Sequence, residues 1–223
     1  MTERPRLVIV GDRVFAEIAH EYFTHDSGYE VVGFSVERDY IRDESFRGLP
    51  MVPFESLEEA FDPAEHSVHV AITYLSFNRV RARLAAEARD RGYALASYVS
   101  SRAFVWPNAE LGEHCFVFED NTVQPFVRVG DNVVLWSGNH IGHHSRIGDN
   151  CFISSHVVVS GGVEVGENTF IGVNSTLVND ITIGRDSWIG PGVTITRDVE
   201  PGSFWTPPRS TLRDESALDK FLA

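Results

Sequence analysis

The stretch VGDNVVLWSGNHIGHHSRIGDNCFISSHVVVSGGVEVGENTFIGV, residues 129–173, places an aliphatic residue at every sixth position. Extended in both directions, the same step runs from Val105 to Ile195, and all 16 of these anchor positions are Ile, Leu or Val. If each position had about a one-in-four chance, the joint probability would be on the order of 10⁻¹⁰. A period of six fits neither a helix nor a hairpin array. It predicts a solenoid of short flat strands whose anchors point inward.

The residues between the anchors support a solenoid. Glycine follows eight of the 16 anchors, at residues 112, 130, 142, 148, 166, 172, 184 and 190. We expect these glycines to permit the corners of the coil. The side chain four residues after an anchor is usually small, as at Cys115, Ser145 and Cys151.

This pattern resembles the left-handed parallel β-helix of the hexapeptide acyltransferases, in which three hexapeptides form one triangular coil. The left-handed winding comes from the resemblance, since parallel crossovers are normally right-handed. Residues one coil apart then stack, roughly 4.8 Å from each other. Cys115 and Cys151 lie two coils apart, which exceeds the about 7 Å that a disulfide allows between Cα atoms. We therefore expect two free thiols in the core.

Residues 6–98 alternate strand and helix patterns. Leu7–Val10, Val31–Phe34 and His69–Ile72 read as buried strands, and the segments 15–23 and 77–92 have helical spacing. This order predicts a small parallel sheet flanked by helices.

The sequence thus predicts an α/β, Rossmann-like domain over residues 1–102 and a left-handed parallel β-helix domain over residues 103–223. Within the second domain we expect repeats over 105–200 and a cap over 201–223. The cap would end in a short C-terminal helix, from Arg213 to Leu222, that covers the open edge of the last coil. The inward residues of that helix would be Leu218, Phe221 and Leu222.

Composition excludes several classes. Nineteen basic against 32 acidic side chains give a net charge of −13, which disfavours nucleic acid and anionic lipid as partners. No apolar run reaches the ~18 residues of a membrane span, and Met1–Pro5 does not read as a signal peptide. We predict a soluble cytoplasmic protein.

Four of the nine histidines lie within 17 residues, at His140, His143, His144 and His156. One outward histidine at a corner is typical of solvated surface, but packing a β-helix does not require three within five residues. Because an unperturbed imidazole titrates near neutrality, the cluster is a candidate for proton transfer.

A small Rossmann-like domain followed by such a solenoid resembles the sialic-acid O-acetyltransferase and bacillosamine N-acetyltransferase family of nucleotide-sugar acyltransferases, over nearly the whole chain. In that family a histidine at a coil corner is the general base, and a carboxylate follows it directly. The segment 143–148 matches this motif with His143 as the base, while His144 stands at the carboxylate position. Asn139, His140 or an acid from a neighbouring subunit are alternatives for orienting the imidazole.

The resemblance implies acetyl-CoA as co-substrate, direct attack by the acceptor, and no metal. The Gly161 N–H would face the thioester oxygen. Coenzyme A would lie along Ser154, Ser155, Gly172, Val173, Gly190 and Pro191. The resemblance also implies a homotrimer with active sites between subunits, and we expect outward Trp136 and Phe126 in that interface.

The family binds the nucleotide of its sugar in the first domain. The candidate residues here are Gly11, Asp12, Arg13, Glu37, Thr73 and Tyr74. Only one glycine stands in the turn after the first strand, but a helix N-terminus still offers backbone donors to phosphate, and Arg13 adds charge. Thr73 and Tyr74 follow the third strand at its carboxyl end, where ligands bind in parallel sheets. The alternative is a degenerate domain that only docks on the solenoid.

The leading hypothesis is transfer of acetyl from acetyl-CoA to an amino group of a nucleotide-linked sugar, in surface-glycan biosynthesis. Acetylation of a sugar hydroxyl is the nearest alternative, because one base and one thioester site serve both nucleophiles. A zinc carbonic anhydrase on the same solenoid would need three converging histidines, for which His140, His143 and His156 are the candidates. A non-catalytic, nucleotide-binding trimer is the remaining alternative.

Overall fold

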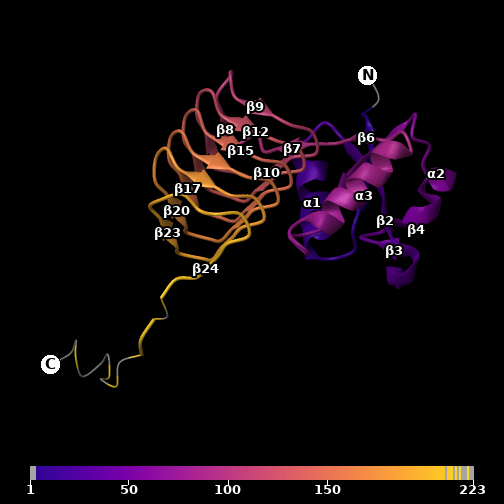
Figure 1. Ribbon diagram of the computed structural model, residues 1–223. Coiled ribbons are helices and arrows are strands. Elements are labelled where there is room, and N and C mark those ends of the chain that lie inside the picture. The colour runs from indigo at the N-terminus through magenta and orange to yellow at the C-terminus, as the bar shows by residue number, and fades with distance from the viewer. Residues whose placement is uncertain (1–3, 209, 213, 215, 217–219, 221–223) are drawn as a thin grey trace.

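The computed structural model describes residues 4–208, 210–212, 214, 216 and 220. A globular α/β domain lies beside the first coils of a solenoid (Figure 1). The strands of the α/β domain are β1 (Arg6–Val10), β2 (Glu30–Val36), β3 (Ser45–Phe46), β4 (Leu49–Pro53), β5 (His66–Val70) and β6 (Ala94–Leu95). Its helices are α1 (Val14–His25), α2 (Leu57–Ala60) and α3 (Arg79–Asp90), with 3₁₀ turns at Arg38–Tyr40 and Phe54–Ser56.

The α/β domain has one sheet in the order β3-β4-β2-β1-β5-β6, parallel except for the β3–β4 hairpin. Alternate residues of β1 point to opposite faces: Leu7 and Ile9 pack with α1, whereas Val8 and Val10 pack with α3. The predicted parallel sheet flanked by helices is confirmed. The strand predicted at His69–Ile72 is β5, which ends at Val70, earlier than expected. Ile72 and Thr73 therefore lie in the loop that follows it.

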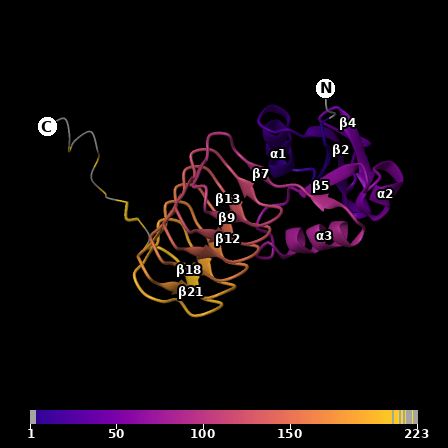
Figure 2. The ribbon, with the colours of Figure 1, turned by 90° about the horizontal axis from the view of Figure 1, so that it is seen from above.

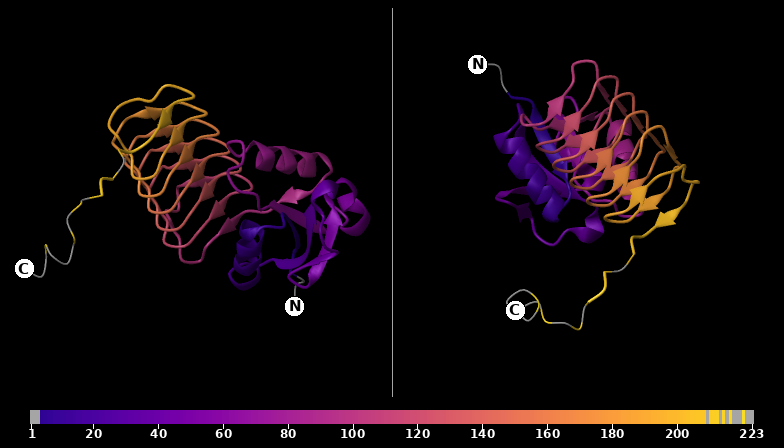
Figure 3. Two further views of the ribbon diagram at one scale, coloured as in Figure 1. Left: turned by 90° about the horizontal axis from the view of Figure 1, so that it is seen from below. Right: turned by 90° about the vertical axis from the view of Figure 1, so that its left-hand side faces the viewer.

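The solenoid strands form three sheets, one on each face of a triangular prism (Figure 3). The first contains β7 (Tyr98–Val99), β10 (Phe116–Val117), β13 (Val134–Leu135), β16 (Phe152–Ile153), β19 (Phe170–Ile171), β22 (Trp188–Ile189) and β24 (Phe204–Trp205). The second contains β8 (Phe104–Val105), β11 (Thr122–Val123), β14 (His140–Ile141), β17 (Val158–Val159), β20 (Thr176–Leu177) and β23 (Thr194–Ile195). The third contains β9 (Glu110–Leu111), β12 (Arg128–Val129), β15 (Arg146–Ile147), β18 (Glu164–Val165) and β21 (Thr182–Ile183).

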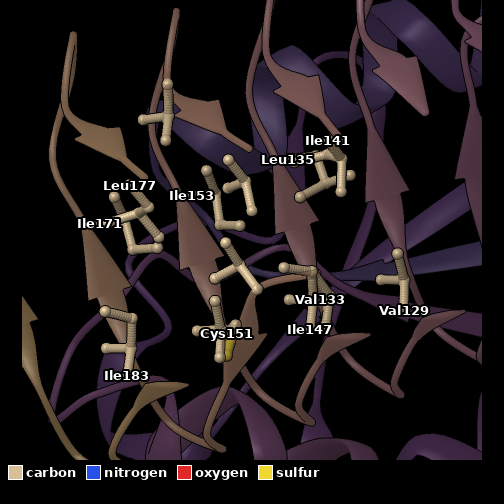
Figure 4. Packing of buried hydrophobic residues seen from close by; sticks show 14 of the residues in the cluster. Val129, Val133, Leu135, Ile141, Ile147, Cys151, Ile153, Ile171, Leu177 and Ile183 are labelled. Atoms are coloured by element: carbon tan, nitrogen blue, oxygen red, sulfur yellow. The ribbon is translucent and has the colours of Figure 1, made fainter. Parts of the chain in front are cut away.

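Every anchor is the second residue of its strand, and each strand pairs in parallel with the strand 18 residues away, as in Val123↔Ile141. All anchors from Val117 to Ile195 are buried in one continuous core (Figure 4). Cys115 and Cys151 are free and buried in the same core, as predicted. The hexapeptide solenoid is therefore confirmed.

The corners are not made by the glycines that follow the anchors, so that expectation is wrong. Left-handed backbone occurs three residues after the anchor, at 14 corners from His114 to Gly192, where Asn, Asp, His and Gly predominate. The glycine next to the anchor instead allows close approach of the next coil: a Cβ on Gly142 would lie 2.5 Å from the Ser160 carbonyl carbon.

The stack extends beyond the predicted repeats at both ends, from β7 at Tyr98 to β24 at Trp205. The domain division at 102/103 stays a prediction. The residues expected to form the inward face of a C-terminal helix, Leu218, Phe221 and Leu222, lie outside the described residues. In the described part of the chain, no helix has both the length and the apolarity needed to cross a bilayer.

The two domains meet along the aromatic first face of the solenoid (Figure 2). Phe15 of α1 lies with its ring centroid 5.4 Å from Phe116 and 6.0 Å from Trp136, and Trp136 stacks on Phe118 at 4.3 Å. The expectation that Trp136 faces another subunit is therefore wrong: its own chain's α/β domain covers it. The position of Trp136 within the hexapeptide repeat correctly predicts a side chain on the outside of the solenoid, but it does not show which segment packs against that side chain.

A buried polar cluster fixes the second contact between the domains. Arg81 of α3 is fully buried and donates hydrogen bonds to the carbonyl oxygens of Val70, His114 and Asn132, at 2.9, 2.9 and 2.6 Å. Two of these acceptors are at solenoid corners and one ends β5. Burial lowers the pKa of the Arg81 guanidinium to about 9, so it remains charged at neutral pH and ties the sheet domain to the coils.

Two neutral histidines complete this cluster. The Nδ1 of His69 lies 2.8 Å from the Ala96 carbonyl oxygen, and the Nε2 of His114 accepts the Val70 N–H at 2.8 Å. Burial, followed by the nearby Arg81 charge, lowers the pKa of His69 to about 3 and the pKa of His114 well below its usual value.

This arrangement predicts that the protein loses stability as pH falls from 6.5 toward 5. The unfolded chain binds protons on both rings near pH 6.5 whereas the folded chain does not, so the free energy of unfolding falls by about 1.4 kcal/mol per pH unit for each ring. Urea unfolding at pH 7, 6 and 5 measures this slope. His69→Gln, which cannot titrate, is expected to remove about half of it; a free energy of unfolding that stayed constant over this range would contradict the argument.

Candidate functional site

The predicted site residues on the solenoid occupy two different edges of the prism. We call the edge formed by residues 124–127, 142–145 and 160–163 the base corner, and the edge formed by residues 136–139, 154–157, 172–175 and 190–193 the groove corner. Strand β17 leads from one to the other across the second face, because residues 154–157 precede it and residues 160–163 follow it. Equivalent residues on the two edges are six apart, which is at most about 20 Å of extended chain.

His143 and His144 contact each other at the base corner. Their Nδ1 atoms are 3.1 Å apart, and both side chains are exposed. The His144 ring stacks on Phe126 of the preceding coil, with centroids 4.7 Å apart and planes at 29°. The backbone N–H of His143 donates to Oε1 of Gln124 at 2.9 Å. One coil therefore supplies the imidazole pair and the coil before it supplies its support.

Gly161 lies directly over the His143 ring, as the repeat phase predicts. A Cβ on Gly161 would fall 2.5 Å from Cε1 of His143, so only glycine leaves space for the imidazole. Within the described residues, no hydrogen bond uses the Gly161 N–H or Nε2 of His143. Both groups are thus free to interact with a ligand at this corner.

The structure does not bring Asn139 or His140 to His143. Asn139 is buried at the groove corner, where its Oδ1 accepts the Val157 N–H at 2.8 Å. His140 lies in β14, half-buried on the second face. Of the candidate orienting residues in this chain, only His144 contacts the His143 ring.

The histidines proposed as zinc ligands do not converge. His140 lies on a strand, His143 at the base corner, and His156 at the groove corner, where its ring packs over Gly138. In the described part of the chain no group of three or more His, Cys, Asp or Glu side chains is arranged to hold a metal ion. The geometry gives the carbonic anhydrase alternative no support.

The residues expected to line the coenzyme groove form one column along the groove corner. Backbone hydrogen bonds hold this column in register: the Asn174 N–H donates to the Ser155 carbonyl at 3.1 Å and the Gly192 N–H to that of Val173 at 2.8 Å. The column contains Ser154, Ser155, Gly172, Val173, Gly190 and Pro191. Val173 is 39% exposed, and a Cβ on Gly172 would lie 2.6 Å from the Pro191 nitrogen. The column thus combines small side chains with two buried glycines, and Val173 and Pro191 are its exposed residues.

A cavity of about 290 Å³ opens at the carboxyl ends of β1, β2 and β5 in the α/β domain. It is lined by five of the six residues predicted to bind the nucleotide, Gly11, Asp12, Arg13, Glu37 and Thr73, together with Phe15, Tyr40 and Leu75. Glu37 accepts a hydrogen bond from Arg83 at 3.0 Å. Sequence reasoning missed Tyr40, which ends a 3₁₀ turn, and Leu75, which lies in the loop after β5, because neither position carries a periodic signal.

Tyr74, the sixth candidate, has a different position. Its ring packs on the aromatic face of the solenoid, with centroids 4.8 Å from Phe170 and 5.1 Å from Phe152. Tyr74 therefore joins the loop after β5 to the coils. Phe15 of α1 lines the cavity and packs on Trp136 at 6.0 Å, and Val80 and Leu84 of α3 line it as well, so the cavity lies on the side of the first face of its own solenoid.

Comparison with known proteins agrees with this architecture. A family model described as bacterial transferase hexapeptide (six repeats) matches residues 126–161 and 162–197. The solved structure of PerB from Caulobacter crescentus, in complex with CoA and GDP-perosamine, is 28% identical with a TM-score of 0.78, covering 89% of this chain and 92% of that one. The acetyltransferase domain of PglB from Neisseria gonorrhoeae FA1090 is 24% identical with a TM-score of 0.80, covering 90% and 95%.

Two further solved structures are complexes, with CoA and GDP-perosamine, of variants of the Caulobacter crescentus enzyme in which a histidine is replaced by asparagine or alanine. Each is 25% identical with a TM-score of 0.59, covering 89% of this chain and 91% of that one. No curated protein sequence matches.

Proposed function

We propose that the chain, which carries bacterial transferase hexapeptide repeats and resembles PerB in its whole architecture, transfers an acetyl group from acetyl-CoA to an amino group of a nucleotide-linked sugar, in surface-glycan biosynthesis. The observation that carries the proposal is the exposed His143 ring, with Nε2 unbonded among the described residues and Gly161 directly above it. PerB, at 28% identity over nearly the whole chain, is a perosamine N-acetyltransferase that binds CoA and GDP-perosamine.

The chemistry assigns a role to each of these groups. Nε2 of His143 takes the proton from the amine as its nitrogen attacks the thioester carbonyl. The Gly161 N–H donates to the oxygen on which negative charge develops. The carbonyl re-forms as the bond to sulfur breaks, and coenzyme A leaves as thiolate. Since the acceptor is itself the nucleophile, the two buried cysteines have no part in the reaction.

His143→Ala is expected to lower kcat by about 10²- to 10⁴-fold, because the general base is lost. Release of free thiol from acetyl-CoA with a panel of nucleotide amino sugars measures it. The control is His25→Ala, which changes an exposed histidine of the α/β domain. Full activity in the His143 variant would refute the base assignment. Treatment of the product with mild base separates an amide from the ester that hydroxyl acetylation would give.

We propose that the cavity of the α/β domain binds the nucleotide diphosphate. It lies at the carboxyl ends of parallel strands and at the N-terminus of α1, and Arg13, with a side chain 63% exposed, borders it.

Arg13→Ala is expected to raise KM for the nucleotide sugar about 3- to 10-fold, leaving kcat and the KM for acetyl-CoA unchanged, because the lost contact is equally strong in the ground and transition states. Arg42→Ala removes an exposed charge that does not line the cavity and should change nothing. Equal effects of the two variants would contradict nucleotide binding at this cavity.

We further propose a homotrimer in which one subunit's base corner meets a neighbour's groove corner. The support is geometric: in one chain the cavity lies on the side of the first face, whereas His143 lies at the edge between the second and third faces. Exposed apolar side chains lie on or beside this face, at Phe104, Trp106, Phe126 and Val158. A cytoplasmic location stays a prediction.

Mixing two inactive variants tests this assembly. His143→Ala lacks the base, and Ser155→Trp obstructs the groove corner. After co-refolding in equal amounts, about one quarter of the intersubunit sites combine an intact base with an intact groove, so activity should recover to about a quarter of wild type. Light scattering measures the oligomer in parallel. A monomer, or a mixture no more active than its parents, would overturn the proposal.

A further inference from the structure

We propose that His144 is a positioning residue that replaces the usual carboxylate: as a neutral imidazole it accepts the Nδ1–H of His143, and this pair is competent only while both rings are unprotonated. This inference rests on the proposed function, since it specifies how the base of that reaction is prepared. The observation behind it is the contact between the two Nδ1 atoms, 3.1 Å apart.

The tautomers follow from the chemistry. A hydrogen bond between two ring nitrogens needs one hydrogen, so one ring donates and the other accepts. If His143 is to take a proton at Nε2, its own hydrogen is on Nδ1. His144 then accepts at Nδ1 and carries its hydrogen on Nε2. The contact thereby selects the His143 tautomer that has a free lone pair toward the acceptor.

Three independent contacts hold the pair in this arrangement. The stack on Phe126 fixes the plane of the His144 ring, and the Gln124 Oε1 holds the His143 backbone N–H at 2.9 Å. Gly161 closes the space above His143, where a Cβ would fall 2.5 Å from Cε1. The backbone of His144 is in the left-handed region, with φ of 60°.

Protonation of His144 would disable the arrangement. A protonated imidazole has two N–H donors and no acceptor, so it cannot receive the Nδ1–H of His143. Two protonated rings would also place like charges at the 3.1 Å contact. Arg128, Arg146 and Glu110 share a cavity of about 250 Å³ with His144. On the other side, the Asp180 carboxylate lies against Gly162, the residue one coil after His144, while His143 contacts the uncharged Gln124 and Gly161.

The repeat provides matched variants for the test. Other corners have Gly or Asn at the position of His144, for example Gly162 and Asn150, so His144→Gly and His144→Asn both suit the left-handed backbone. Glycine removes the acceptor, whereas the Asn Oδ1 retains one that does not titrate. Asn168→Gly makes the same backbone change at an equivalent corner on another edge of the prism and serves as control.

We expect His144→Gly to lower kcat about 10- to 100-fold with KM unchanged, and His144→Asn to stay within about threefold of wild type. His144→Glu, which restores a carboxylate, should move the midpoint of the acid limb of the pH–rate profile upward by about 1 unit, since a negative partner stabilises the imidazolium. The proposal is overturned if His144→Gly matches the Asn168→Gly control, or if His144→Glu leaves the acid limb where it is in wild type.

A second measurement separates this proposal from the proposed function. Nitrogen-15 NMR of the imidazoles reports the tautomer without any substrate. Wild type should show His143 with its hydrogen on Nδ1, and His144→Gly should shift it toward the Nε2–H form. If these tautomers are observed while no nucleotide sugar is acetylated, the inference about the histidine pair holds and the transferase assignment fails. If wild-type His143 carries its hydrogen on Nε2, the proposal fails even in an active enzyme.

Discussion

Parallel pairing between residues 18 apart is the constraint on which the rest of this structure depends. The strands of each coil donate backbone N–H groups to the next coil, as from Gly142 to the Val159 carbonyl at 2.8 Å, and the aliphatic anchors fill the interior. The phase of a residue within the hexapeptide then decides whether it is core, face or corner. The chemistry at the base corner follows from this repeat, because the coil spacing alone brings Gly161 over the His143 ring.

This arithmetic explains why so much of the solenoid was predictable. The column of Ser155, Val173 and Pro191 and the free thiols of Cys115 and Cys151 follow from counting in steps of 18. Counting does not show what covers an outward residue, so Trp136 was assigned to the wrong contact. Nor does counting show why a glycine follows an anchor. The structure shows that a side chain there would collide with the next coil, whereas the left-handed backbone occurs two residues further along the chain.

The junction between the domains had no periodic signal. Arg81 falls on a helical pattern and reads as a surface charge, but it is buried against the carbonyl groups of Val70, His114 and Asn132. The buried guanidinium is stabilised there because each of its three nitrogens donates a hydrogen bond to a backbone carbonyl oxygen. Its partners come from segments far apart in sequence, so only the folded chain reveals the contact. This contact also fixes the α/β domain, and with it the cavity, against the first face of the solenoid.

The position after His143 illustrates how side chains can vary at one corner position of the repeat. The third residue after each anchor must tolerate left-handed backbone, and Asn132, His144, Gly162 and Asp180 all satisfy this condition with the same coil geometry. A change there costs the fold little, since the anchors and the coil-to-coil hydrogen bonds are untouched. It nevertheless replaces the group that contacts His143, the proposed base. An imidazole at residue 144 therefore places a titratable, uncharged-when-neutral ring beside His143 while the coil that holds both residues keeps the same hydrogen bonds.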